Sequence, residues 1–135
     1  PVRAIRWAME DAEVSPADVD YINAHGTSTP LNDASETRAI RTALGAQADA
    51  VAVSSTKSMI GHAFGAAGAI EAVATVRTLE TGTMHPTINL DTPDPECDLD
   101  YVPNQKRAAS ISYALSNSFG FGGTNASLLF KRYED

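Results

Sequence analysis

The chain has 135 residues and a mass of 14.2 kDa, which is the length of one ordinary domain. Ten Lys and Arg stand against 17 Asp and Glu, and the resulting charge of −7 argues against generic nucleic-acid binding and against attraction to anionic lipid. The single cysteine, Cys97, excludes an internal disulfide framework and a Cys-based metal cluster. With 43% hydrophobic residues, 20% charged residues and no apolar run long enough to cross a bilayer, the composition indicates a globular domain.

Local patterns predict alternating helices and strands along the chain. Apolar residues recur at helical spacing near the N-terminus, and β-branched runs bounded by turn residues indicate strands. In chain order we predict a helix at 2–12, a capped turn at 15–18, a strand at 19–24, a helix from Asn32 or Asp33 (as its cap) to Gly45, a strand at 51–55, a helix from about His62 to Thr81, short strands at 87–90 and 99–102, and longer strands at 109–116 and 126–131. Alternation followed by a closing hairpin predicts an α/β layered fold with a mixed sheet.

The first candidate for chemistry is the segment His25–Pro30, directly after the predicted strand at 19–24. A histidine just past the carboxyl end of a buried strand lies where α/β folds place their ligands. Gly26 lets the backbone turn sharply, and the hydroxyls of Thr27 and Thr29 are able to bind a polar ligand. The alternative interpretation is a histidine that only satisfies its own loop.

The second candidate is the segment Ser55–His62, which follows the next predicted strand. At a helix N-terminus, His62 is expected to be neutral and able to donate to a developing oxyanion. A buried Lys57 would need a partner, and Glu71 on the following helix is the obvious one. The small residues Gly65–Ala69 predict close packing of that helix against another backbone. The alternative is a solvated lysine and a capping histidine, but two strand-end histidine loops in one short chain favour a function.

The third candidate is the glycine-rich turn at 120–123, which is neither a P-loop nor a dinucleotide fingerprint. Taken alone, this turn is interpreted as a tight hairpin, the alternative being that Phe121 acts as a mobile plug. His85 is interpreted as structural, and no zinc site is expected. Cys97 lies between two acidic residues, which raise a thiol pKa and suit an inert cysteine. The chain thus offers oxyanion stabilisers but no convincing nucleophile, so half of a site is missing.

Three long motifs occur in this chain: Asn23-Ala24-His25-Gly26-Thr27-Ser28-Thr29-Pro30, Ser54-Ser55-Thr56-Lys57-Ser58-Met59-Ile60-Gly61-His62 and Asn117-Ser118-Phe119-Gly120-Phe121-Gly122-Gly123-Thr124-Asn125. With them, essentially all 135 residues resemble the C-terminal half of a β-ketoacyl-acyl carrier protein synthase of the thiolase superfamily. The segments 86–90 and 97–100 are most similar to the KAS II type. The resemblance implies the C-terminal half of a thiolase-like fold, which is layered αβαβα in the full protein.

The resemblance implies catalytic roles for three residues. His25 and His62 would be the two histidines of a Cys-His-His triad, and Lys57 would be the active-site lysine, paired with Glu71. The family's nucleophilic cysteine lies in the N-terminal half, and Cys97 does not match it. Residues 1–135 would therefore be a C-terminal half-domain, without its first strand, that is inactive alone.

The resemblance also implies how the substrate is held. Thr27 and Thr29 would bind the phosphopantetheine arm, which arrives on the carrier protein, so no other cofactor and no metal is expected. Phe121 would be a gating phenylalanine whose N–H helps to form the acyl oxyanion hole, and Asn125 would support its loop.

The implied activity is the decarboxylative Claisen condensation of malonyl-carrier protein with an acyl-enzyme thioester in fatty acid elongation. The expected partners are the acyl and malonyl carrier proteins, the N-terminal half and a second copy in a homodimer, with no nucleic acid and no membrane, in the cytoplasm. Because carrier proteins are acidic, the basic docking patch is expected mainly elsewhere, supplemented at most by Arg38, Arg41, Lys106 or Arg107. The alternatives are a discrete polyketide ketosynthase, a non-catalytic subunit similar to a chain-length factor, and, fitting less well, a thiolase or ketoacyl synthase III.

Overall fold

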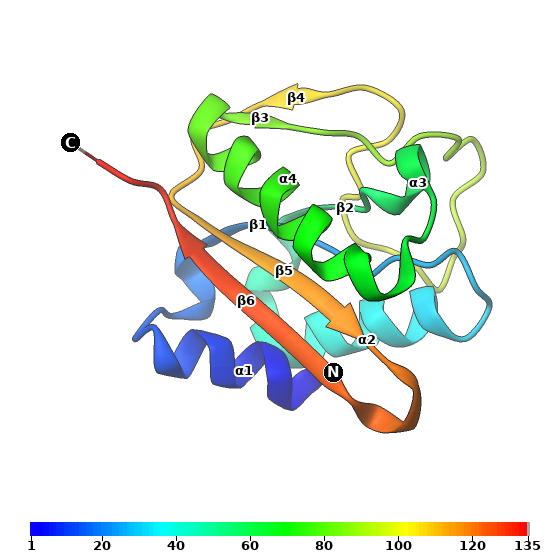
Figure 1. Cartoon of the computed structure of the whole chain (residues 1–135), viewed down its shortest axis with the longest axis horizontal. Coiled ribbons are helices and arrows are strands. Elements are labelled where there is room, and N and C mark those ends of the chain that lie inside the picture. The colour runs from blue at the N-terminus through cyan, green and yellow to red at the C-terminus, as the bar shows by residue number, and fades with distance from the viewer. Residues whose placement is uncertain (135) are drawn as a thin grey trace.

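The computed structural model describes residues 1–134, and its centre is a four-stranded mixed sheet in the order β2-β1-β5-β6 (Figure 1). β1 (Val19–Asn23) runs parallel to β2 (Ala52–Ser54) and to β5 (Tyr113–Phe119). β6 (Asn125–Lys131) is antiparallel to β5 and forms the closing hairpin. The predicted α/β fold with a mixed sheet is confirmed.

Helices cover both faces of this sheet (Figure 1). α1 (Val2–Asp11) and α2 (Asn32–Leu44) lie on one face, and α4 (Ala67–Thr81) lies on the other. None of the helices within residues 1–134 is long and apolar enough to cross a membrane. The remaining elements are η1 (Pro16–Asp18), η2 (Gly45–Asp49), α3 (Lys57–Ile60), η3 (Phe64–Ala66), β3 (Thr83–Met84), β4 (Arg107–Ala108) and η4 (Phe121–Gly123).

The core follows the two-residue period of the strands, which sends neighbouring side chains to opposite faces. On the α1/α2 side, buried residues of the sheet meet those of the two helices: Ile5, Met9, Ile22, Ile40, Val53 and Leu115. On the α4 side, a second cluster closes the other face: Tyr21, Ala52, Leu79, Met84, Ile111 and Ala114. The two clusters fix the strand ends from which the site is built.

The long helix was predicted to begin at His62, and this is wrong. α4 begins at Ala67, because Gly61 (φ 78°) and Phe64 (φ 47°) take left-handed backbone conformations that interrupt a helix. The close packing predicted for Gly65–Ala69 holds at Gly68, where a Cβ would lie 3.2 Å from Ser118 Oγ of β5. Gly65 lies in η3, before the helix, and a Cβ there would meet nothing within 4 Å, so of these two glycines only Gly68 is closely packed.

The cap predicted for α2 is also wrong. The helix begins at Asn32 without a side-chain cap, since the carboxylate of Asp33 accepts from the N–H of Ser28 at 3.1 Å instead. The predicted ends of these helices, at Gly45 for α2 and at Thr81 for α4, are confirmed.

The predicted strands at 87–90 and 99–102 do not form. Only isolated bridges occur in these segments, and left-handed conformations at Asn89 (φ 61°) and Val102 (φ 48°) prevent regular extension. The strand predicted at 109–116 begins only at Tyr113, because the N–H groups of Ser112 and Tyr113 donate to the carboxylate of Asp20.

Candidate active site

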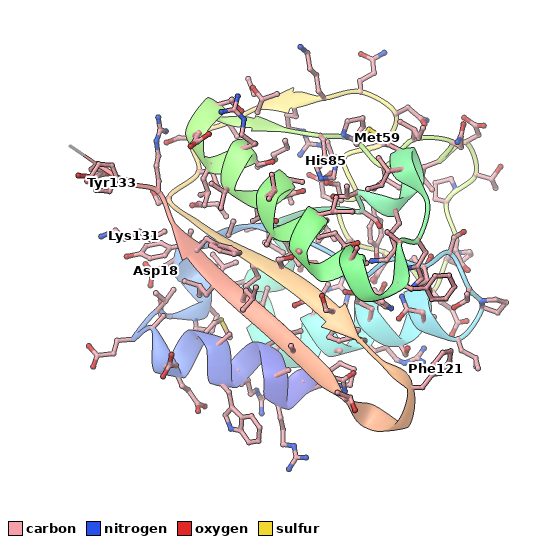
Figure 2. The ribbon with its side chains drawn as sticks, viewed as in Figure 1. Asp18, Met59, His85, Phe121, Lys131 and Tyr133 are labelled. Carbon is pink, nitrogen blue, oxygen red and sulfur yellow. The ribbon has the colours of Figure 1, made fainter. Side chains whose placement is uncertain are left out.

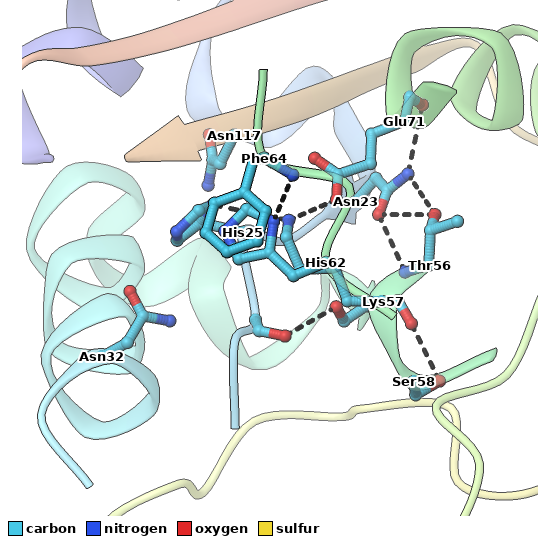
Figure 3. A network of polar contacts seen from close by, with 12 residues as sticks. Asn23, His25, Asn32, Thr56, Lys57, Ser58, His62, Phe64, Glu71 and Asn117 are labelled. Atoms are coloured by element: carbon cyan, nitrogen blue, oxygen red, sulfur yellow. Dashed lines mark hydrogen bonds and ion pairs between the residues drawn. The ribbon is translucent and has the colours of Figure 1, made fainter. Parts of the chain in front are cut away.

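The candidate site forms where β1 and β2 end, since the carboxyl ends of parallel neighbours meet at one edge of a sheet. His25 lies two residues after β1, and Lys57 lies three residues after β2, at the start of α3. Lys57 Nζ is 3.4 Å from His25 Nδ1, and both side chains are buried (Figure 3). The first two segments singled out in the sequence are therefore brought together.

Lys57 also forms the ion pair predicted with Glu71 of α4 (Figure 3). The side chains of the two residues are only 5% and 2% exposed. Burial raises the pKa of Glu71, and the hydrogen bond and charge of Lys57 oppose this. Glu71 Oε2 is buried without a hydrogen-bond partner among residues 1–134. The lysine thus needs this carboxylate in order to be buried, and it is held beside His25 as a result.

The protonation of His25 follows from its surroundings. Burial lowers its pKa to about 4, and the charge of Lys57 acts in the same direction, so the imidazole is neutral near pH 7. An ammonium group has hydrogens to donate and no lone pair to accept, so Lys57 Nζ donates to His25 Nδ1. The single imidazole proton therefore lies on Nε2, which is left as a donor.

His62 follows α3 and is exposed. Its Nδ1 accepts from the N–H of Phe64 at 3.2 Å, and the two rings stack with centroids 5.0 Å apart. Because an accepting ring nitrogen carries no proton, the proton of His62 also lies on Nε2. His62 presents the expected donor, but the helix-dipole reason given for it is wrong, since α4 starts five residues later. The His25 and His62 rings lie edge to face, 5.6 Å apart.

Sequence reasoning missed Glu36, which is only 3% exposed on α2. Its carboxylate accepts from the main-chain N–H groups of His25 and Gly26, each at 2.9 Å. It also accepts from the side-chain amides of Asn117 at 3.2 Å and Asn32 at 3.3 Å. The available signal was an acidic residue on the apolar stripe of a predicted helix, where a buried charge requires partners.

A further phenylalanine of the glycine-rich hairpin, Phe119, lies beside His25. The Phe119 ring at the end of β5 lies 5.6 Å from that of His25. Phe121 lies at the tip of the hairpin with a relative exposure of 102% (Figure 2). Asn125 pairs with Phe119 across the hairpin, so it stands at the base of the loop that carries Phe121. The gating role of Phe121 stays a prediction.

A cavity of about 1050 Å³ opens beside the segment 26–30 and the end of β2. Thr27, Thr29, Lys57 and His62 line it together with the segment 87–94. The hydroxyls of Thr27 and Thr29 are 3.2 Å apart at this wall. The two threonines predicted to hold a polar arm therefore face the same space as His62.

The remaining thiol and the third histidine have other surroundings. Burial raises the pKa of Cys97, helped by the charges of Asp94 and Asp33 rather than by the two flanking acids. His85 Nε2 lies 3.1 Å from Tyr21 Oη inside a polar network, as its structural interpretation predicts. No group of three or more His, Cys, Asp or Glu within residues 1–134 is placed to hold a metal ion.

Three of the four basic residues considered for docking already form ion pairs. These are Arg38 with Glu96, Arg41 with Asp49 and Asp98, and Arg107 with Asp100. Their charge is partly neutralised within the chain, so they offer little to an acidic partner.

The sequence of this chain is similar to the sequences of known proteins over almost its whole length. The chain is 62% identical to 3-oxoacyl-[acyl-carrier-protein] synthase 2 of Synechocystis sp. and 53% identical to the synthase 2 of Staphylococcus aureus. Each match covers 98% of this chain and 32% of the relative, so the chain spans about a third of the length of the curated relatives it matches.

Solved structures agree with this relationship. One is the AntDE:AntF structure, a type II PKS acyl-carrier protein in complex with its ketosynthase. The matched chain of that structure is 47% identical to this chain, with a TM-score of 0.96, and the match covers 98% of this chain and 33% of the matched chain. Another is the ishigamide ketosynthase/chain length factor, with 41% identity and a TM-score of 0.94 over 98% and 32%. The family model for the beta-ketoacyl synthase C-terminal domain matches residues 1–91. The chain therefore belongs to the β-ketoacyl synthase family, whose C-terminal, thiolase-like domain it contains.

Proposed function

We propose that this chain is the C-terminal part of a 3-oxoacyl-[acyl-carrier-protein] synthase II. The proposed reaction is the decarboxylative condensation of malonyl-carrier protein with an acyl-enzyme thioester in fatty acid elongation. The observation that carries the proposal is the pair of imidazoles, His25 and His62, each with its proton on Nε2 and with rings 5.6 Å apart.

This pair suits the decarboxylation step. When the bond between C2 and the carboxylate of the malonyl group breaks, CO2 leaves and negative charge develops on the thioester oxygen. The two Nε2–H groups of His25 and His62 are donors for that oxygen, and donors held in place before the reaction are worth about 10²–10³ in rate each. Lys57 supports them by holding the tautomer of His25.

Condensation then requires an acylated cysteine, whose thiol is the nucleophile of the earlier acyl-transfer step and is not supplied by this chain. The carbanion attacks the acyl carbonyl, the new C–C bond forms, and the C–S bond to the acylated cysteine breaks, which releases a thiolate that takes up a proton. Cys97 is unsuited to this role because its surroundings raise its pKa. We assign the nucleophile to the N-terminal half, and we expect this chain alone to form no acyl-enzyme.

The cavity wall suits a substrate delivered on a carrier protein. Thr27 and Thr29 would hydrogen-bond the phosphopantetheine arm, so the enzyme needs no cofactor of its own. The AntDE:AntF structure is of a ketosynthase with an acyl-carrier protein, which supports such a partner here. Because the chain carries a charge of −7, we place most of the docking surface in the N-terminal half, together with a homodimer contact.

A discrete polyketide ketosynthase is the second candidate, supported by the match to AntDE:AntF. The higher identity to the two synthases, 62% and 53% against 47%, favours fatty acid elongation. A non-catalytic partner similar to a chain-length factor would need neither the histidine pair nor the buried Lys57, and this chain has all three.

The test is His62→Ala in the full-length protein. Decarboxylation of malonyl-carrier protein should be abolished, while acyl transfer to the nucleophilic cysteine stays largely intact. His62→Gln, which keeps an N–H donor, is the matched variant and should retain part of the rate. Normal decarboxylation in His62→Ala would remove the oxyanion role, and a stable acyl adduct on Cys97 would overturn the assignment of the nucleophile.

A further inference from the structure

The third histidine of the chain, His85, is joined by hydrogen bonds to the ends of β1 and β2 (Figure 2). Its Nε2 lies 3.0 Å from Thr56 Oγ1 and 3.1 Å from Tyr21 Oη. Its Nδ1 lies 3.3 Å from Ser54 Oγ and 3.3 Å from the carbonyl oxygen of Pro86. Within residues 1–134, His85 is not part of the cavity wall, so an effect of this residue on the reaction must act through another residue.

The surroundings of the His85 ring fix the direction of its hydrogen bonds. Because a carbonyl oxygen only accepts, the contact with Pro86 places a proton on Nδ1. Burial lowers the pKa of His85, so the ring is neutral near pH 7 and Nε2 carries a lone pair. Of the two hydroxyls near Nε2, that of Tyr21 has a closer acceptor in Ser54 Oγ at 2.7 Å. The hydroxyl of Thr56 is therefore the donor to Nε2.

Thr56 connects this ring to the active-site lysine. It is only 5% exposed, and its hydroxyl accepts from Asn23 Nδ2 at 2.8 Å while it donates to His85. Asn23 Oδ1, the other acceptor near this hydroxyl, is farther away at 3.2 Å. The carbonyl of Thr56 accepts from the N–H of Met59 at 3.0 Å and so starts α3, whose first residue is Lys57.

Two further hydrogen bonds fasten the loop after β3 to the turn formed by residues 54–58. Thr87 Oγ1 accepts from the N–H of Ser55 at 3.2 Å, and Ser58 Oγ accepts from the N–H of Ile88 at 3.1 Å. These bonds lie on both sides of the lysine in sequence. The loop therefore clasps the turn along its length and does not touch it at one end alone.

The position of the lysine ammonium group depends on this turn. Lys57 Nζ lies 3.4 Å from His25 Nδ1 and is paired at the same time with Glu71. A side chain pivots on its own backbone, so a rotation at Thr56 would move Nζ relative to His25. A misplacement of about 1 Å is able to cost about 10²-fold in rate.

We propose that His85 is a positioning residue for Lys57, because its Nε2 holds the hydroxyl of Thr56 and thereby the start of α3. This inference rests on the proposed function for its kinetic consequence. The placement itself rests only on the contacts of His85 and Thr56.

The first test compares two amides at position 85 in the full-length protein. A glutamine oxygen reaches the place of Nε2 and accepts from Thr56, whereas an asparagine amide reaches only the place of Nδ1. We expect His85→Asn to lower kcat for malonyl decarboxylation about tenfold with KM nearly unchanged. Acyl transfer to the nucleophilic cysteine should stay within about twofold in this variant. His85→Gln should stay within about threefold of the wild-type kcat.

Tyr21→Phe is the matched control. It removes the other hydroxyl near Nε2 together with a buried hydrogen bond to Ser54, so it should lower stability but keep both wild-type rates. A selective loss of decarboxylation in Tyr21→Phe would overturn the inference, because the effect would then not depend on Thr56.

Equal rates in His85→Asn and the wild type, or equal losses in His85→Asn and His85→Gln, would also overturn it. So would a parallel loss of both half-reactions, because a merely structural role lowers the fraction of folded enzyme and hence every activity alike. If His85→Asn does not fold, Thr56→Val removes the same hydrogen bond from its other end, and the same split between half-reactions is expected of it.

Nitrogen NMR of protein labelled with 15N-histidine gives a readout that needs no activity. The ring resonances of His25 should shift in His85→Asn, because Nδ1 accepts from the displaced lysine, and should stay in place in His85→Gln. Unchanged His25 resonances in His85→Asn would refute the positioning role. A wild-type protein that does not decarboxylate malonyl-carrier protein, with His25 shifted as expected in His85→Asn, would refute the proposed function and leave this inference standing.

Discussion

The buried pair of Lys57 and Glu71 makes a quantitative prediction about stability. With side chains only 5% and 2% exposed, removal of either partner leaves a charge in the protein interior. Lys57→Met and Glu71→Leu should each lower the free energy of unfolding by about 3–5 kcal/mol. The double variant replaces both charges by apolar groups and should lose only about 1 kcal/mol or less, since neither charge then remains to be desolvated.

The measurement is a double-mutant cycle in the full-length protein. Hydrogen exchange of peptides from β1, β2 and α4 reports the local free energy of opening, because whole-protein unfolding of a long chain is not two-state. The two single losses should add to far more than the loss in the double variant. Additive losses would refute the pairing of Lys57 with Glu71 as the reason that both are buried.

The same double variant separates stability from catalysis. It should regain its stability but not its malonyl decarboxylation, because His25 Nδ1 has lost the donor that fixes the proton on Nε2. A double variant with the wild-type rate would contradict the role given to Lys57.

Three further predictions concern the turn and the cavity. The folded pKa of His25 is lowered from 6.5 to about 4, so its contribution to stability is complete above pH 6.5 and is lost as the pH falls toward 4. Screened by solvent, this contribution is worth about 2 kcal/mol. The Tm of His25→Asn, measured between pH 6.5 and pH 4, should therefore depend less on pH than the Tm of the wild type, and an equal pH dependence would contradict the lowered pKa. Gly26→Ala should cost about 2 kcal/mol or more in local opening free energy, and Ser55→Gly in that background should restore only the steric part. Cys97 should react slowly with iodoacetamide at pH 7 and faster above pH 9; fast labelling at pH 7 would contradict the raised pKa of its thiol.

Periodicity in the sequence predicted the framework well. The strands at the centre and the helices α1 and α2 follow from short-range patterns, and the pairing of Lys57 with Glu71 follows from the rule that a buried charge needs a partner. The irregular segments were predicted less well, because left-handed residues such as Phe64 and Asn89 carry no strong local signal. These conformations are set by tertiary contacts, which a linear pattern does not contain.

In the candidate site, too, some features follow from local sequence patterns and others depend on tertiary contacts. Motif and strand-end position single out His25 and His62 as candidates, whereas the reason for their tautomers is spatial, since it depends on Lys57 and on the N–H of Phe64. Glu36 was missed because its two main-chain contacts lie 10 and 11 residues away in sequence, beyond any helical or strand period. A charged residue on an apolar stripe is the signal by which such anchors can be sought.

The position of the lysine explains how a cation can assist a neutral imidazole. Lys57 Nζ lies on the Nδ1 side of His25, so protonation of His25 would place a second positive charge 3.4 Å from the first. The ring is thereby kept neutral, and its Nε2–H remains available to a substrate oxygen. Glu71 balances the charge of the lysine, so Lys57 polarises His25 without leaving a net charge in the interior. The donor strength of His25 and the burial of the ion pair are therefore two consequences of one arrangement.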